Sequence, residues 1–227
     1  AHRPWGQPIT LGSFAATTTL RLDGPGPRTL RVHAAIHRGA YQGDYTLEQI
    51  RAILTFQIAL NKFSLQPTEA LVAASTLTAL GEQAQAPVLQ ANFAHWPAVQ
   101  MEVATQINGE FIRAEVSAQL QAQTALIQAE GRVAPTLISS ILGAHTPRAA
   151  SYFLLADPIA FRATAALGPH WNFSRLVGRF DAGRLNSRGV PITALRGQID
   201  LQPTTLFIHD AQMELGENSA HGSYGMN

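Results

Sequence analysis

The strongest constraint on the fold is an alternation of apolar and polar residues with a period of two. Within residues 50–60, every second position is apolar, and Arg51, Thr55 and Gln57 lie between these positions. Residues 99–107 and 114–122 repeat the pattern. Successive side chains of a β-strand point to opposite faces, so the alternation predicts strands with one apolar and one wetted face. This pattern is typical of antiparallel sheet.

Further strands are predicted at 9–22, 29–38, 125–133, 159–167, 171–180 and 206–213. The Asn108-Gly109 dipeptide stands between two alternating segments and predicts a tight hairpin turn. The predicted fold class is therefore mostly β. It consists of antiparallel sheets of repeated strand units that form a curled groove or an open sandwich.

One stretch interrupts the alternation. Residues 134–143 have apolar residues at helical spacing and end in Gly143, and Pro147 is suited to the first turn of a second helix. We therefore predict a short helical hairpin at 134–155. It would separate a first β-segment (1–133) from a second (156–227).

Two strands of similar sequence occur in these segments, "IRAILTFQ" (50–57) and "LRGQIDLQ" (195–202). An Arg-Gly pair precedes each one, at 38–39 and at 188–189, and another strand-like segment follows each one. We interpret residues 29–66 as a unit of strand, Arg-Gly turn, strand, turn and strand that recurs in the second β-segment.

Composition excludes several classes of function. The net charge is +1 and no basic tract is present, so a nucleic-acid partner is not expected. The chain has no cysteine, which rules out disulfides, thiol catalysis and cysteine metal sites. No apolar stretch approaches the roughly 18 residues of a membrane helix, and no signal peptide is visible. We expect the sequence to be a segment of a longer protein.

Candidate chemical groups are sparse. Of the eight histidines, His33 and His37 share one face of a predicted strand, roughly 13 Å apart, which is too far for one metal ion. His209 and Asp210 lie near Glu214 and Glu217, where an acid–base pair is conceivable, but polar residues on a wetted face are the favoured interpretation. No nucleotide or nucleophile motif is present. We predict no catalytic residue, metal or cofactor, and do not expect an enzyme.

The one local basic cluster has two interpretations. It could meet anionic phospholipid headgroups, but Asp181 and Asp200 lie among its members, which favours an ordinary solvated face. The cluster consists of Arg175, Arg179, Arg184, Arg188 and Arg196.

The apolar faces need a cover, which two sheets can provide for each other. The residues alone therefore allow a self-contained β-sandwich binding module, of carbohydrate-binding or adhesion type.

The sequence after residue 130 favours a different interpretation. Residues 129–143 ("AEGRVAPTLISSILG") and 177–225 resemble the AsmA-like family of bacterial envelope proteins, which includes TamB-type proteins. The matching features are Gly178, Gly183, Arg188-Gly189, Gly216 and the small-residue segment Gly222-Ser223-Tyr224-Gly225. Residues 45–77 match more weakly as another copy.

The resemblance implies a periplasmic segment of a protein tethered in the inner membrane, with a β-groove that carries phospholipid toward the outer membrane. Its partners would be phospholipid acyl chains and neighbouring repeats of the same chain. The groove candidates are the alternating apolar residues of the best strands: Ile50, Leu54, Phe56, Ile58, Met101, Val103, Val116, Leu120, Leu195, Ile199 and Leu201.

Overall fold

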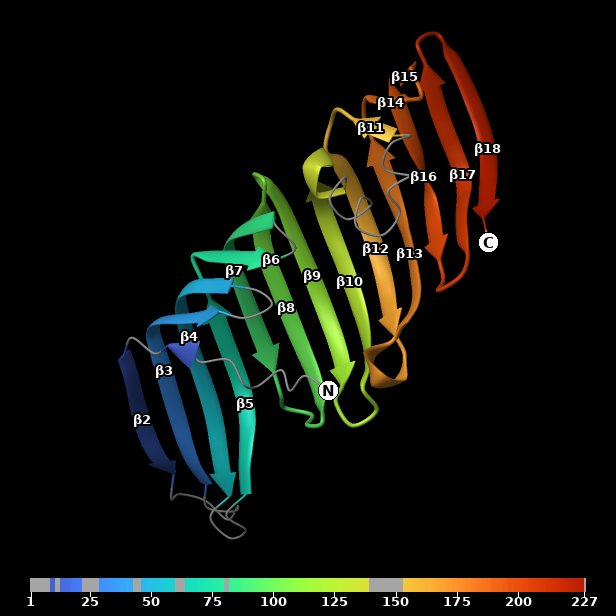
Figure 1. The fold of residues 1–227 in the computed structure, drawn as a ribbon. Helices are drawn as coiled ribbons and strands as arrows, with labels where there is room; N and C mark the ends of the chain where they lie inside the picture. Colours follow the sequence, from blue (N-terminus) through green and yellow to red (C-terminus); the bar gives the residue numbers. More distant parts are fainter. Residues whose placement is uncertain are drawn as a thin grey trace. The chain divides into compact units, whose positions relative to one another are not determined.

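The computed structural model is mostly β, as predicted, and its paired strands are antiparallel. It describes residues 9–10, 13–21, 29–42, 46–59, 64–79, 82–138 and 153–226. Figure 1 shows the strands and their labels. In this part of the chain, no helix is long and apolar enough to cross a membrane.

The chain forms two compact units. Unit 1 comprises Ala1–Thr105 and Gln119–Gln121, and unit 2 comprises Gln106–Ala118 and Ala122–Asn227. Residues 134 and 155, the bounds of the predicted insert, both lie inside unit 2. The strands on either side of that insert pair directly with each other, from Ala125 opposite Leu167 to Val133 opposite Ile159.

Unit 1 is built on one antiparallel sheet in the order β1-β3-β4-β5-β7-β8, with β2 paired to β3 and β6 paired to β4 and β7. Its strands are β1 (Ile9–Thr10), β2 (Ser13–Arg21), β3 (Thr29–Gln42), β4 (Thr46–Ala59), β5 (Ser64–Ala73), β6 (Thr76–Ala79), β7 (Glu82–Asn92) and β8 (Ala98–Ile107).

Unit 2 has a main sheet in the order β9-β10-β12-β13-β16-β17-β18 and a small sheet in the order β11-β14-β15. Its elements are β9 (Glu110–Gln119), β10 (Thr124–Val133), β11 (Phe153–Leu155), β12 (Ile159–Leu167), the short 3-10 helix η1 (Pro169–Trp171), β13 (Phe173–Ala182), β14 (Leu185–Ser187), β15 (Val190–Ile192), β16 (Ala194–Leu201), β17 (Leu206–Leu215) and β18 (Asn218–Met226).

The long strands form where the sequence alternates. In β9, and in β10 from Ala125 onward, half-buried or buried residues alternate with exposed ones, as a sheet covered on one face requires. Asn108 and Gly109, in the turn before β9, both have positive φ, at 51° and 82°. A two-residue hairpin turn of type I′ needs this conformation at both positions, so the predicted turn is confirmed.

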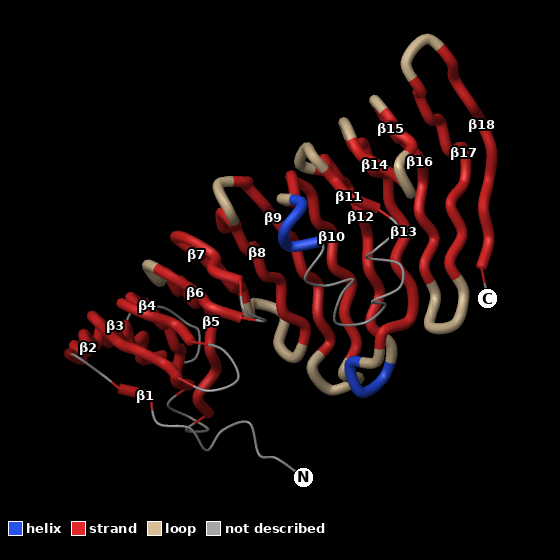
Figure 2. Tube along the Cα trace, turned by 45° about the horizontal axis from the view of Figure 1, so that its top comes forward, coloured by secondary structure: helices blue, strands red, loops and turns tan. Residues whose placement is uncertain are grey.

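The helical hairpin prediction is only partly correct. Residues 135–138 form one helical turn, drawn blue in Figure 2. Residues 139–152 lie outside the described part. Phe153–Leu155 is the strand β11, not helix, and it pairs with β14. The helical prediction fails there because β14, about 30 residues further along the chain, supplies the backbone partners of a strand.

The small sheet of unit 2 begins where strands of the main sheet turn a corner. The unit 2 corner comprises residues 156–158, 183–184 and Thr193. Asp157 accepts hydrogen bonds from the Arg184 guanidinium at 3.0 and 3.1 Å and from the Arg184 backbone N–H at 2.9 Å. The Ala156 N–H donates to the Arg184 carbonyl at 2.9 Å. These bonds tie the two bent segments together.

Unit 1 has a corner made of backbone irregularities. The unit 1 corner comprises Arg38, Gln49, Ser75 and Ala86. Arg38, Gln49 and Ala86 have φ of 54°, 50° and 47°, and Ser75 separates β5 from β6. Arg38-Gly39 therefore lies in a bulge inside β3, whereas Arg188-Gly189 is the hairpin turn between β14 and β15. The two Arg-Gly pairs occupy different local structures, and the repetition of the whole unit remains a prediction.

Candidate ligand-binding face

One face of the main sheet of unit 2 is apolar over the strands β10, β12, β13, β16 and β17. The register places Ile127, Ala165, Leu176 and Leu201 in one row across four strands. Neighbouring rows continue the face over β10, β12, β13, β16 and β17 with side chains that form no hydrogen bonds. The face comprises Ala125, Ile127, Ala129, Gly131, Val133, Ile159, Phe161, Ala163, Ala165, Leu167, Leu176, Gly178, Phe180, Ala182, Leu195, Gly197, Ile199, Leu201, Leu206, Ile208, Ala211, Met213 and Leu215. We call it the unit 2 apolar face.

A row of small residues spans three of the five strands of this face. Ala129, Ala163 and Gly178 face one another on β10, β12 and β13. A Cβ at Gly178 would lie 2.7 Å from the Cβ of Ala163, so only glycine fits there. Larger side chains flank the row, with Phe161 opposite Phe180 on one side. The surface is therefore lower along this row than beside it.

Little of the apolar surface is covered. Among the described residues, the only buried apolar side chains larger than alanine are Val99, Leu185 and Ile192. Leu185 and Ile192 belong to the small sheet, and with Ala182 they form a buried cluster on which Leu195 and other residues of the unit 2 apolar face pack. The small sheet thus covers one end of this face. The large side chains elsewhere on it are only half-buried.

Unit 1 has its own apolar face. Ala34, Leu54, Ala70 and Ala91 form a row across β3, β4, β5 and β7. Ala70 and Ala91 are buried with Val99, and the half-buried side chains of Leu54, Leu89, Phe93, Met101 and Leu120 pack against them. The buried members are small, so this cluster is a row of alanines under larger, partly exposed neighbours.

The predicted groove candidates divide between the two units. Unit 1 holds Ile50, Leu54, Phe56, Ile58, Met101, Val103 and Leu120, and unit 2 holds Val116, Leu195, Ile199 and Leu201. All are half-buried. In unit 2, Ile199 lies between Gly178 and Ile208, and Leu201 lies between Leu176 and Leu206. Leu195 packs on the buried cluster at the corner.

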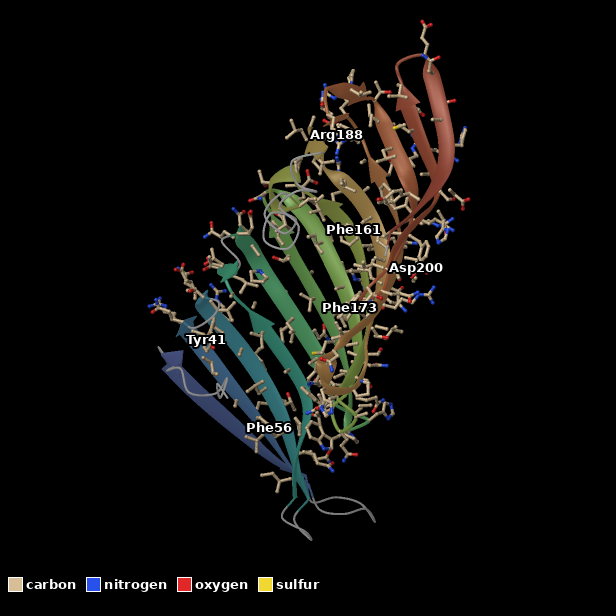
Figure 3. All side chains as sticks on the ribbon, turned by 45° about the vertical axis from the view of Figure 1, so that its right-hand side comes forward. Tyr41, Phe56, Phe161, Phe173, Arg188 and Asp200 are labelled. Carbon is tan, nitrogen blue, oxygen red and sulfur yellow. The ribbon has the colours of Figure 1, made fainter. Side chains whose placement is uncertain are left out.

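The candidate list omitted the aromatic part of the unit 2 apolar face. Phe161 and Phe180 face each other on β12 and β13, and the Phe180 ring lies 3.2 Å from the position of a Cβ on Gly197. Their strands were predicted, and the i, i+2 spacing of residues 159–167 could have placed Phe161 on the apolar side. Figure 3 labels Phe161 on this face and Asp200 on the opposite one.

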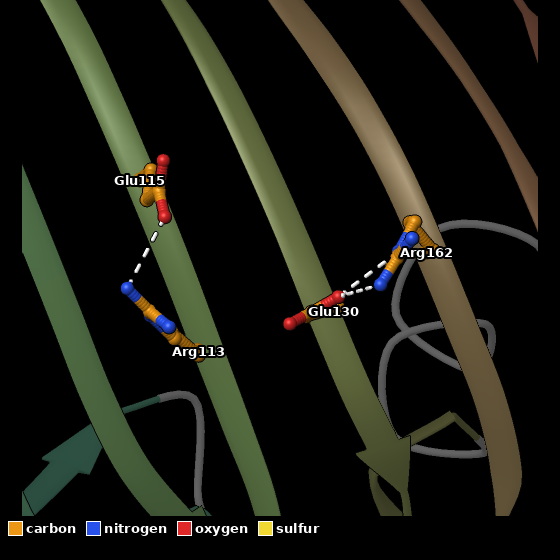
Figure 4. A network of polar contacts seen from close by, with 4 residues as sticks. All are labelled: Arg113, Glu115, Glu130 and Arg162. Atoms are coloured by element: carbon orange, nitrogen blue, oxygen red, sulfur yellow. Dashed lines mark hydrogen bonds and ion pairs between the residues drawn. The ribbon is translucent and has the colours of Figure 1, made fainter.

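The opposite, polar face of unit 2 is lined by ion pairs. Arg175 donates two hydrogen bonds to Asp200, at 2.6 and 2.9 Å, and this pairing lowers the pKa of Asp200. Arg196 pairs with Asp181 at 3.2 Å. Figure 4 shows Arg162 donating to Glu130 and Arg113 donating to Glu115. This face is suited to contact with water.

The predicted basic cluster is divided by the fold. Arg175, Arg179 and Arg196 lie on the polar face of β13 and β16, where two of them have acidic partners. Arg184 holds the unit 2 corner, and Arg188 lies in the turn between β14 and β15.

The suggested acid–base pair is not assembled as a site. His209 stacks on Phe207 with ring centroids 5.9 Å apart, and Asp210 accepts a hydrogen bond from Gln198 at 3.0 Å. Both side chains are exposed.

Neither protein-family models, nor curated proteins, nor solved structures give a match to this chain.

Proposed function

We propose that this chain is a structural, lipid-conducting β-groove segment of an AsmA-like envelope protein, and that its apolar faces contact phospholipid acyl chains. The observation that carries the proposal is the unit 2 apolar face, which spans five strands without one polar side chain and is mostly only half-buried. Its partners would be lipid and neighbouring repeats, in the periplasm of a diderm bacterium.

The physical argument is one of solvation. An apolar surface that spans five strands is costly to leave in water, so it marks a place where an apolar partner binds. An acyl chain needs apolar contact and no directed hydrogen bonds, and each buried CH₂ contributes about 0.8 kcal/mol. The row Ala129, Ala163 and Gly178 offers such a chain a lower path over β10, β12 and β13, which ends at Ile199 on β16.

The same face is a poor surface for sugar. Carbohydrate binding needs polar groups that fix the orientation of hydroxyls. The positions that face this side on β10, β12, β13, β16 and β17 offer none. The sequence resemblance of residues 129–143 and 177–225 to the AsmA-like family supports the same choice and supplies the proposed location.

The test compares two adjacent residues that point to opposite faces. Leu176→Glu places a charge in the unit 2 apolar face, between Ala165 and Leu201, whereas Val177→Glu places it on the polar face, where Val177 is 36% exposed. We expect lipid to co-purify with the unaltered chain and with Val177→Glu. We expect Leu176→Glu to reduce it several-fold, as measured by native mass spectrometry and by binding of a fluorescent fatty acid.

Thermal unfolding, monitored by circular dichroism, shows whether each variant is folded. Because Leu176 is half-buried, the acyl-chain proposal expects Leu176→Glu to fold. An unaltered chain free of lipid after gentle purification would contradict the proposal, as would equal lipid occupancy in both variants. Unfolding of Leu176→Glu together with a lipid-free parent would indicate a closed sandwich instead.

A further inference from the structure

Three turns lie at the end of unit 2 that is opposite the small sheet. Residues 122–123 precede β10, residues 168–172 join β12 to β13 through η1, and residues 202–205 join β16 to β17. The Trp171 N–H donates to the Gln123 carbonyl at 2.9 Å, so the first two turns are in contact. We call this end the η1 end. The lower of the two blue segments in Figure 2 is η1.

The three turns of the η1 end contain no Asp, Glu, Lys or Arg. The connections at the opposite end of the same strands contain Asp157, Arg184, Arg188 and Glu217. A charged side chain is costly to transfer from water to a less polar medium. Of the two ends of unit 2, the η1 end is therefore the one that can leave bulk water at little cost.

Large apolar side chains are exposed near the η1 end on both faces of the sheet. On the polar face, Leu126, Val177 and Phe207 are 42%, 36% and 37% exposed. Phe173, labelled in Figure 3, is 39% exposed and lies opposite Leu167 of the unit 2 apolar face. A protein partner would cover one face of the sheet, whereas a lipid bilayer surrounds an inserted end on all sides. This distribution favours a bilayer.

The charges nearest to the η1 end neutralise each other. Arg175 and Asp200 are the only charged residues among the described positions of the two cross-strand rows next to the turns, and Arg175 donates to Asp200 at 2.6 and 2.9 Å. Further charges begin in the next row, with Glu130, Arg162 and Arg179. The η1 end therefore has no net charge, which suits zwitterionic lipid headgroups.

The turn at η1 contains a tryptophan where the backbone favours glycine. The Asn172 N–H donates to the Pro169 carbonyl at 3.4 Å, and His170 and Trp171 between them have φ of 60° and 61°. Positive φ at both central residues is the type I′ conformation, for which Asn-Gly is the preferred pair. A bulky residue at such a position points to a role beyond folding. The Trp171 side chain is 40% exposed.

The backbone of these turns is hydrogen-bonded within the protein. The Gly168 N–H donates to the Asn172 carbonyl at 2.8 Å, and the Gln202 N–H donates to the Thr205 carbonyl at 2.8 Å. Unpaired backbone groups are costly in a membrane, so internal hydrogen bonds allow these turns to approach one.

We propose that the η1 end of unit 2 docks on the surface of a zwitterionic phospholipid bilayer, with Trp171 and Phe173 at the level of the headgroups. Tryptophan is enriched at membrane–water interfaces, because its apolar ring carries a polar N–H. Docking brings the uncovered end of the unit 2 apolar face to the bilayer. The proposal does not depend on an acyl chain that lies on that face.

Trp171→Gly tests the docking and preserves the fold, because glycine is favoured at this backbone position. Sedimentation with phosphatidylcholine vesicles measures binding. We expect the unaltered chain to bind, and Trp171→Gly to bind roughly tenfold more weakly through loss of a buried ring. Its melting temperature should equal or exceed that of the parent. The matched control Phe111→Thr removes a 53% exposed ring at the opposite end of β9 and should bind like the parent.

Fluorescence reports the position of the ring. The chain has three tryptophans, so replacement of Trp5 and Trp96 by phenylalanine leaves Trp171 as the single emitter. Its emission should shift to shorter wavelength when phosphatidylcholine vesicles are added. Lipids brominated near the headgroup end of their acyl chains should quench it.

Four outcomes would each overturn the proposal. These are no binding to phosphatidylcholine vesicles, equal binding by Trp171→Gly and the parent, unchanged Trp171 emission, and binding confined to phosphatidylglycerol vesicles, which would be electrostatic. Native mass spectrometry separates this proposal from the acyl-chain proposal. A chain that retains no lipid but binds vesicles through Trp171 would contradict the acyl-chain proposal and support the docking.

Discussion

The two corners of this protein achieve different degrees of burial with the same type of strand. At the unit 2 corner, the chain leaves the main sheet and forms a separate three-stranded sheet, which buries Leu185 and Ile192 to 4% and 5% exposure. At the unit 1 corner, the strand ends stay in the same sheet. There, Tyr41, Leu47, Leu77 and Ala84 face one another in a row, and of these only Ala84 is buried.

This difference shows which structural feature covers an apolar face. A bulge bends a sheet and keeps its hydrogen-bond ladder, as Ala86 N–H donating to the Ser75 carbonyl at 2.9 Å illustrates. It adds no second layer. The small sheet of unit 2 does add one, and among the described residues leucine and isoleucine side chains are buried only there. A single bent sheet leaves its apolar surface available to a partner.

The largest effect should come from truncating the buried corner. Leu185→Ala removes a buried side chain and leaves a cavity, so we expect a loss of about 2–4 kcal/mol in the free energy of unfolding. The matched change Leu47→Ala, at a half-buried position of the unit 1 corner, should cost about 1 kcal/mol. Urea denaturation measures both. Equal losses of unfolding free energy would contradict the inferred difference in burial between the two corners.

A smaller, pH-dependent effect should come from the ion pair at the unit 2 corner. The side-chain hydrogen bond from Arg184 lowers the pKa of Asp157 from 3.8 to about 2. A carboxyl whose pKa is lower in the folded state contributes stability above its unfolded pKa and loses it as pH falls toward the folded value. Asp157→Asn should therefore melt below the parent at pH 6, and this gap should close between about pH 4 and pH 2.

Melting curves over that pH range check the prediction. A gap that stays constant down to pH 2 would mean that the carboxylate charge at residue 157 does not hold the corner. Because the ion pair is exposed and screened by water, we expect a smaller effect than that of Leu185→Ala.

The smallest effect should be a gain at the unit 1 corner. Ala86 has φ of 47°, a conformation that costs a residue with a Cβ about 1 kcal/mol more than glycine. Ala86→Gly should therefore stabilise the chain by up to about 1 kcal/mol. Ala84→Gly, two residues away at a buried position, should destabilise it by a similar amount. A loss at both positions would show that Ala86 is not strained.

Most long strands were predictable from the sequence, because one face of each strand is partly covered and the other is exposed to water. Residues 159–167 were predicted and observed with the same bounds, since alternation continues from Ile159 to Leu167. The alternation did not predict β7, because Ala86, with its positive φ, forms a bulge after which the inward-facing positions are shifted by one residue. Ala84 is buried before the bulge, and Leu89 and Ala91 point inward after it.

The short strands were not predictable for another reason. With three residues each, β11, β14 and β15 are too short for a period to show, and they exist because they pair with one another. The bond between Asp157 and Arg184 joins residues 27 apart in the chain, so no local pattern contains it. The candidate face was predicted in part, through Ile199 and Leu201, but only the strand register shows that Phe161 lies opposite Phe180.

Antiparallel strands with one apolar face follow from the amino-acid pattern alone, because a period of two is a local property of each strand. How much of that face is covered depends on the long-range packing of the chain. Burial depends on whether a second layer lies over the sheet, and in unit 2 that layer comes from segments brought together by long-range pairing of β11 with β14. Alternation specifies which side is apolar, and topology specifies whether anything covers it.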